Sequence, residues 1–91
     1  MTVVQIELED SRPVRAHCDA SQLHVELADG RTLSAPLWWY PRLLNADASA
    51  RSEIELMPMG LSWPGLDEDI SIASILRGQK APGAVGPSRA A

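Results

Sequence analysis

Hydrophobic and polar residues alternate with a period of two through most of the first 36 residues, and no other feature constrains the fold as strongly. A period of two is typical of strands with one buried face. In the central segment Leu23, Val25 and Leu27 alternate with His24 and Glu26, so the three aliphatic residues are predicted to face the core. Four strands are therefore predicted, over residues 3–8, 14–18, 22–27 and 31–35.

Turn residues separate these segments. Residues 10–13 read Asp-Ser-Arg-Pro, which breaks the first alternation. Asp29-Gly30 predicts a two-residue hairpin with a type I′ turn, because that turn needs positive φ. Val14, Ala16 and Cys18 are predicted on the inward face of their strand, and Leu33 on that of the return strand. The first 36 residues thus predict an antiparallel meander of three to four strands.

Beyond Pro36 the pattern changes to short helices. We expect two of them, at about residues 38–45 and 47–53, with Pro41 in the first turn of one and Asn45 or Asp47 as a break or new N-cap. A further short hairpin follows, with strands around Ile54–Met57 and Leu61–Trp63 and Gly60 as its turn.

The last element is a short C-terminal helix. Ser71 is its expected N-cap, and Gly78 its expected end. Its buried stripe is predicted to hold Ile72, Ile75 and Leu76. The fold class is therefore α+β, with a single domain over residues 1–78 and a disordered tail over 79–91, where Ala, Gly, Pro and Ser dominate.

Charge makes nucleic acid a poor partner. The chain has a net charge of −4, and residues 1–78 hold all twelve acids and six of the eight bases. Binding to a phosphate backbone requires clustered Lys and Arg, which release counterions. The two bases of the tail are too few to supply them, so we expect no direct binding to plain DNA.

Cysteine and histidine give no basis for an enzyme or a metal centre. Cys18 is the only cysteine, which excludes an intramolecular disulfide and favours a reducing cytoplasm. Cys18 is expected on the apolar face, where burial makes a thiol inert. His17 and His24 lack an evident third ligand and are expected to be exposed strand residues. No signal peptide or membrane span is expected, and the chain is predicted to need no cofactor.

The candidate binding site is an aromatic block with nearby charges. Trp38, Trp39 and Tyr40 are consecutive, so in a strand or a helix they cannot all face one core. At least one is expected at the surface, where Trp and Tyr often anchor a partner, although capping the sheet is the structural alternative. The predicted partner-binding residues are Trp38, Trp39, Tyr40, Arg42, Asp67, Glu68 and Asp69. For the three acids, placement before a helix N-terminus is favoured over a metal site.

Four motifs resemble the family called domain of unknown function 2442, over about residues 14–78. They are Asp29-Gly30-Arg31, the block PLWWYPRLL at 36–44, Trp63-Pro64 and LDEDI at 66–70. Where the family usually has a longer glycine-rich loop, this chain has Met57-Pro58-Met59-Gly60, and Ile54 stands where the family often has an aromatic residue. The resemblance implies a small bacterial or phage α+β domain. Such proteins are often encoded beside a domain of unknown function 4160 protein, in pairs that look like toxin–antitoxin modules, and the resemblance carries over no catalytic residue.

The leading hypothesis is a non-enzymatic, antitoxin-like interaction domain that binds a small, basic, co-encoded protein. Acidic charge would steer such a partner. A homodimer formed through the aromatic block is an alternative to this partner. Two rivals come from other classes: a regulatory or nucleic-acid-associated module, and a phage-encoded acidic inhibitor. The first lacks a basic face, and the acids are too dispersed for the second.

Overall fold

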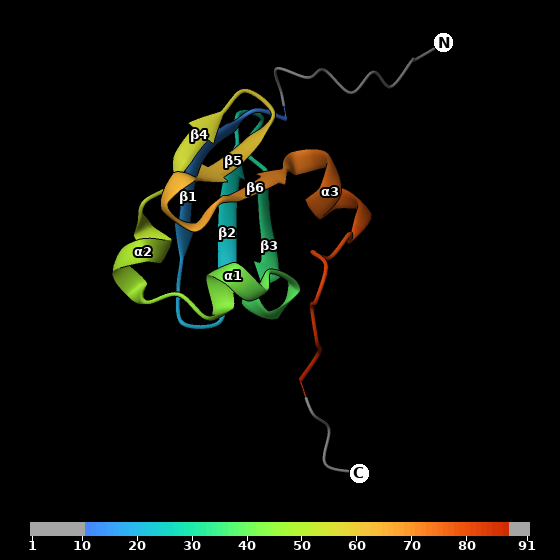
Figure 1. Ribbon diagram of the computed structural model, residues 1–91. Helices are drawn as coiled ribbons and strands as arrows, with labels where there is room; N and C mark the ends of the chain where they lie inside the picture. The colour runs from blue at the N-terminus through green and yellow to red at the C-terminus, as the bar shows by residue number, and fades with distance from the viewer. Residues whose placement is uncertain (1–10, 88–91) are drawn as a thin grey trace.

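The computed structural model describes residues 11–87 and consists of two three-stranded antiparallel sheets with short helices at their ends (Figure 1). This confirms the α+β prediction. The strand predicted at residues 3–8 lies outside the described residues. In chain order the elements are β1 (Pro13–Cys18), β2 (Gln22–Leu27), β3 (Thr32–Pro36), the 3-10 helix η1 (Leu37–Trp39), α1 (Pro41–Leu44), α2 (Ala48–Ser52), β4 (Glu55–Met57), β5 (Gly60–Trp63), the 3-10 helix η2 (Pro64–Leu66), β6 (Glu68–Ser71) and α3 (Ile72–Arg77).

The first sheet has the order β1-β2-β3, and its central strand follows the predicted alternation. Leu23, Val25 and Leu27 are at most 1% exposed. The expectation for β1 was wrong at Val14, which is exposed. The ladder between β1 and β2 is irregular between Pro13 and Arg15, and this bulge turns Val14 away from the core.

The β2–β3 hairpin forms at Asp29-Gly30, but its turn is not type I′. The Leu27 carbonyl accepts from the Gly30 N–H at 3.0 Å, and the Leu27 N–H donates to the Arg31 carbonyl at 2.8 Å. Gly30 has φ +94°, whereas Asp29 is not among the described residues with positive φ. The loop therefore has three residues, a type I turn followed by a left-handed glycine, which is the next most common hairpin connection.

The first predicted helix, at 38–45, is interrupted at Tyr40. η1 precedes this residue and α1 follows it, while Tyr40 itself has φ −130° and ψ 89°. The cause is Pro41, whose ring excludes the helical region for the residue before it. The second predicted helix is confirmed as α2, and its N-cap is Asp47, whose carboxylate accepts from the Ala50 N–H at 2.7 Å.

The second sheet has the order β4-β5-β6, so the predicted hairpin is present but is extended by a third strand. The acids at 68–69 lie in this strand rather than in a loop before a helix. The prediction of Gly60 as the turn residue was also wrong, because Gly60 begins β5 and pairs with Ser71 of β6. A Cβ at Gly60 would lie 2.5 Å from the Ile70 carbonyl oxygen, so the close approach of β6 requires glycine there.

The C-terminal helix α3 has the predicted ends. The Ser71 hydroxyl accepts from the Ser74 N–H at 3.0 Å, and Gly78 follows with φ 72°. Ile72 and Ile75 are buried, but Leu76 is 49% exposed, contrary to prediction. α3 has only six residues, and its contacts with β3 and β5 cover the side that carries Ile72 and Ile75.

The core lies between the two sheets and is closed by η1, α1 and α3. Trp63 is fully buried and stands in for the phenylalanines that the chain lacks. Its Nε1–H donates to the Arg51 carbonyl at 3.0 Å, so the polar atom of this large side chain has a partner. The buried hydrophobic residues are Leu23, Val25, Leu27, Ala35, Leu37, Tyr40, Leu43, Leu61, Trp63, Ile70, Ile72 and Ile75.

Candidate functional site

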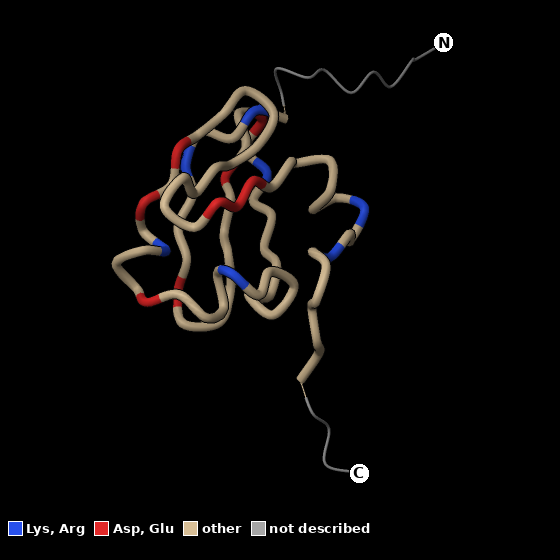
Figure 2. The backbone as a smooth tube through the Cα atoms, in the orientation of Figure 1, with Lys and Arg blue, Asp and Glu red and all other residues tan. Residues whose placement is uncertain are grey.

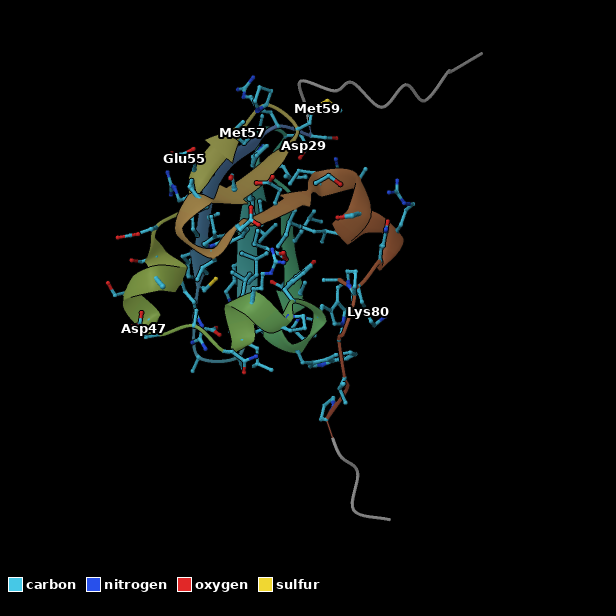
Figure 3. All side chains as sticks on the ribbon, in the orientation of Figure 1. Asp29, Asp47, Glu55, Met57, Met59 and Lys80 are labelled. Atoms are coloured by element: carbon cyan, nitrogen blue, oxygen red, sulfur yellow. The ribbon has the colours of Figure 1, made fainter. Side chains whose placement is uncertain are left out.

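A groove of about 860 Å³ lies beside β6, lined by strands β5 and β6, helix α3 and the segment 79–82 that follows it. Met57 and Met59, at the tip of the β4–β5 hairpin, belong to its wall, and so does Lys80 beyond α3 (Figure 3). The two methionines are 46% and 55% exposed. The groove therefore combines an accessible apolar lip with charged walls.

Tyr40 lines this groove but belongs to the core. The residue is 3% exposed, and its hydroxyl oxygen is buried without a hydrogen-bond partner among the described residues. Burial, and to a lesser degree the negative charge of Glu68, raises the pKa of Tyr40 to about 12. A buried polar group normally has a partner, so this hydroxyl is an exception within the fold.

Glu68 and Asp69 lie on β6 and line the same groove. Glu68 is half-buried, and neither carboxylate makes a hydrogen bond or ion pair with any residue in the described range 11–87. Burial raises the pKa of Glu68, and the positive charge of Arg42 partly opposes this. The basic residues Arg77, at the end of α3, and Lys80, just beyond it, also line the groove. Figure 2 shows basic positions in this part of the backbone, apart from the acidic positions of β6.

Arg42 and Asp67 pair with each other next to the groove. The Arg42 guanidinium donates to the Asp67 carbonyl oxygen, and its Nη1 lies 3.7 Å from the Asp67 carboxylate. Asp67 ends η2 in the left-handed conformation, with φ 51°. Both side chains are exposed, so the ion pair itself contributes at most about 1 kcal/mol to stability.

Trp38 and Trp39 are half-buried and are covered by the chain's own C-terminal segment. The Lys80 ammonium lies 4.7 Å from the ring centroid of Trp39 and 5.7 Å from that of Trp38. The Ala81 N–H donates to the Trp39 carbonyl at 2.9 Å, and a Cβ at Gly86 would lie 3.6 Å from the Trp38 ring. The described part of the tail thus contacts the aromatic block, while the disorder predicted for residues 79–91 stays a prediction.

The structure brings most of the predicted partner-binding residues to one face. Tyr40, Glu68 and Asp69 line the groove, whereas Arg42 and Asp67 lie beside it. Trp38 and Trp39 do not line the groove, but Lys80, which does, lies over both of their rings. Sequence reasoning did not assign Met57, Met59, Arg77 and Lys80 to this face. The unusual run Met57-Pro58-Met59 was visible, but nothing in the sequence placed it near Tyr40.

The two histidines form a separate cluster on the first sheet. His17 and His24 pair across β1 and β2, with ring centroids 4.9 Å apart. His24 is held by Asp19 at 2.7 Å and by the Ser34 hydroxyl at 2.8 Å, so both of its nitrogens are engaged. Hydrogen bonds from His24, Ser21 and Gln22 hold the pKa of Asp19 well below its usual range.

Cys18 is half-buried, and burial raises the pKa of its thiol. Within residues 11–87, no three His, Cys, Asp or Glu side chains are arranged to hold a metal ion. The same residues include no helix with the length and apolar character needed to cross a membrane.

Comparison with known proteins agrees with the motifs and the fold. The family described as "Protein of unknown function (DUF2442)" matches residues 13–81. The chain belongs to this family. The DUF2442 match includes both sheets, α3 and every groove residue except Pro82, but the family description specifies no activity. A crystal structure of a protein of unknown function from Rhodospirillum rubrum ATCC 11170 is similar, with a TM-score of 0.70 and 26% sequence identity, over 80% of this chain and 93% of that one. No curated protein matches this sequence.

Proposed function

We propose that this DUF2442 chain is a non-enzymatic interaction domain that binds a small protein partner through the groove beside β6. One observation carries the proposal: the groove joins exposed apolar side chains to carboxylates and a buried hydroxyl that lack partners among residues 11–87. Such a surface offers apolar area and specific polar contacts together, which is the composition of binding sites in general.

Charge indicates the kind of partner. Residues 1–78 hold twelve acids and six arginines, and two of the acids line the groove. An acidic surface speeds encounter with a basic protein and disfavours acidic ones. We therefore propose a basic partner. By analogy with the pairs in which members of this family are often encoded, we propose that the partner is co-encoded and that the two proteins form an antitoxin-like module. The single cysteine supports a cytoplasmic location for this module.

The test is quantitative capture from the protein's own host, with groove variants. Met57→Ser and Met59→Ser remove apolar area from the lip of the groove without touching the core. Leu44→Ser is the matched control, because Leu44 is 42% exposed on α1 and does not line the groove. Mass spectrometry would identify the bound proteins, and thermal unfolding would verify that all variants are folded.

The expected result is one stoichiometric small basic protein, retained by the Leu44 variant and depleted at least about fivefold by the methionine variants, since loss of apolar contact area weakens binding. Capture unaffected by the methionine substitutions would exclude the groove as the interface. A clean homodimer with no captured protein would instead assign this face to self-association.

A further inference from the structure

The charged groups of the groove differ in whether they already have partners. The Lys80 ammonium lies over the two tryptophan rings and donates to the Gly78 carbonyl at 3.4 Å, and Arg77 donates to the Gln79 side chain at 3.2 Å. Each base of the groove thus has a contact within the chain, although neither forms an ion pair with a carboxylate among residues 11–87. The groups without partners among residues 11–87 are acceptors and a hydroxyl, which Glu68, Asp69 and Tyr40 supply.

The ligand that fits this set must therefore bring hydrogen-bond donors and positive charge. We propose that the groove beside β6 recognises a guanidinium group, presented as an arginine side chain by the partner, with the Glu68 carboxylate and the Tyr40 hydroxyl oxygen as its acceptors. This inference rests on the proposed function and names the chemistry of the partner at that site.

Guanidinium suits the two acceptors better than ammonium does. It has five N–H donors in one plane, so it can donate to a carboxylate and to a neighbouring hydroxyl oxygen at once. It is also more weakly hydrated, which lowers the cost of entering a site where Tyr40 is 3% exposed. The exposed methionines of the wall, Met57 and Met59, would contact the methylene stem of an arginine.

The arginine whose charge acts on Glu68 already has a partner. Arg42 acts on the charge of Glu68, yet its hydrogen bond goes to the Asp67 carbonyl. Among residues 11–87, no side chain therefore occupies Glu68 as a hydrogen-bond or ion-pair partner. The buried Tyr40 hydroxyl is a second observation, independent of the charge of Glu68. This neutral group also lacks a hydrogen-bond partner within the described chain.

The experiment titrates the full-length protein with n-butylguanidinium, n-butylammonium and 1-butanol, and follows backbone amide shifts by NMR. These probes share one alkyl chain and differ only in the head group. Saturable shifts at Tyr40 and residues 68–71 are expected for the guanidinium probe, with weaker binding of the ammonium probe and none that saturates for the alcohol.

Three variants make the result specific. Glu68→Gln is expected to weaken binding of n-butylguanidinium at least about tenfold, because it removes a charge-assisted hydrogen bond, and Tyr40→Phe to weaken it about threefold or more. Glu55→Gln is the matched control, since Glu55 is an exposed acid on β4 outside the groove (Figure 3), and it should leave binding unchanged.

Equal binding of the three probes, or unchanged binding by Glu68→Gln, would overturn the inference. Ammonium binding as tight as guanidinium would also overturn it. These outcomes are separate from the test of the proposed function. A captured partner that depends on Met57 and Met59 would stand even if no guanidinium site existed, and a guanidinium site would stand even if no partner were captured.

Discussion

Substitution of Tyr40 by phenylalanine is expected to stabilise the folded protein. The hydroxyl oxygen is buried and has no hydrogen-bond partner among the described residues, so the folded state loses a hydrogen bond to water without replacing it. A buried unsatisfied polar group costs about 1–3 kcal/mol. Phenylalanine keeps the ring and its packing, and it should recover a large share of this cost, about 1–2 kcal/mol. For a chain of this size the melting temperature should rise by roughly 4–8 °C per kcal/mol.

Urea denaturation followed by tryptophan fluorescence provides the measurement, with Trp63→Phe as the contrast. The indole N–H of Trp63 donates to the Arg51 carbonyl at 3.0 Å, so that substitution removes a satisfied hydrogen bond and creates a small cavity. It should therefore lower the free energy of unfolding, by roughly 1–3 kcal/mol. Loss of the polar atom is thus expected to raise the free energy of unfolding at Tyr40 and to lower it at Trp63.

Alkaline pH gives an independent check on the same hydroxyl. The pKa of Tyr40 is raised to about 12 in the folded protein, against about 10 in an unfolded chain. Between these values the unfolded state loses its proton first, so stability is complete below pH 10 and falls as the pH rises toward 12. Two pKa units correspond to roughly 3 kcal/mol. Tyr40 is the only tyrosine, so ultraviolet absorbance of the phenolate reports this group alone.

A destabilised Tyr40→Phe variant would show that the hydroxyl has a hydrogen-bond partner in the folded protein. A loss of about 1 kcal/mol is what an ordinary hydrogen-bonded tyrosine gives. A phenolate titration near pH 10 would likewise show that the hydroxyl is neither desolvated nor near the charge of Glu68. Either result would remove the observation on which the guanidinium site depends.

Three further predictions test other parts of the fold. Gly60→Ala should destabilise the protein by about 3 kcal/mol or more in urea, because the new Cβ would clash with the Ile70 carbonyl, whereas Gly65→Ala, with only a 3.8 Å contact, should be tolerated. Deletion of residues 79–91 should shift tryptophan emission to longer wavelength and increase acrylamide quenching; unchanged spectra would contradict the contacts of the tail with Trp38 and Trp39. Asp19→Asn should lower stability at pH 7, and this effect should shrink as the pH falls below the unfolded pKa of about 3.9 and disappear only below the still lower pKa of the folded state, because a depressed pKa gives stability that is lost progressively between the two; an effect of the same size at pH 7 and in strong acid would contradict this.

Features that depend on neighbouring residues in the sequence could be predicted. The alternation of Leu23, Val25 and Leu27 gave the buried face of β2, and the N-caps Asp47 and Ser71 gave the starts of two helices. Each is a local preference, expressed within about four residues. The interruption at Tyr40 is also local, since Pro41 disfavours the helical conformation before it, but the prediction of one helix over 38–45 missed it.

Features that depend on pairing between distant segments were missed. β6 has one buried residue among four, Ile70, so its sequence carries little alternation, and its strand character comes from pairing with β5. Gly60 was predicted to be a turn residue because its partner in the sheet, Ser71, is distant in the sequence. Only the close approach of Ile70 and Ser71 shows that glycine is needed inside the strand.

The candidate site illustrates both cases. Tyr40, Glu68 and Asp69 were chosen from their residue types, and the fold does place them on one groove. Composition could not show that the Tyr40 hydroxyl would be buried without a partner, or that Lys80 would already be engaged by two tryptophan rings. In the proposed guanidinium site these two facts favour a donor as the ligand, because Lys80 already has contacts within the chain, whereas Glu68 and the Tyr40 hydroxyl have none among residues 11–87. The same residues with Lys80 free and Glu68 paired would select an anion instead. Under this proposal, the specificity of the domain depends on which side chains the fold leaves unpaired.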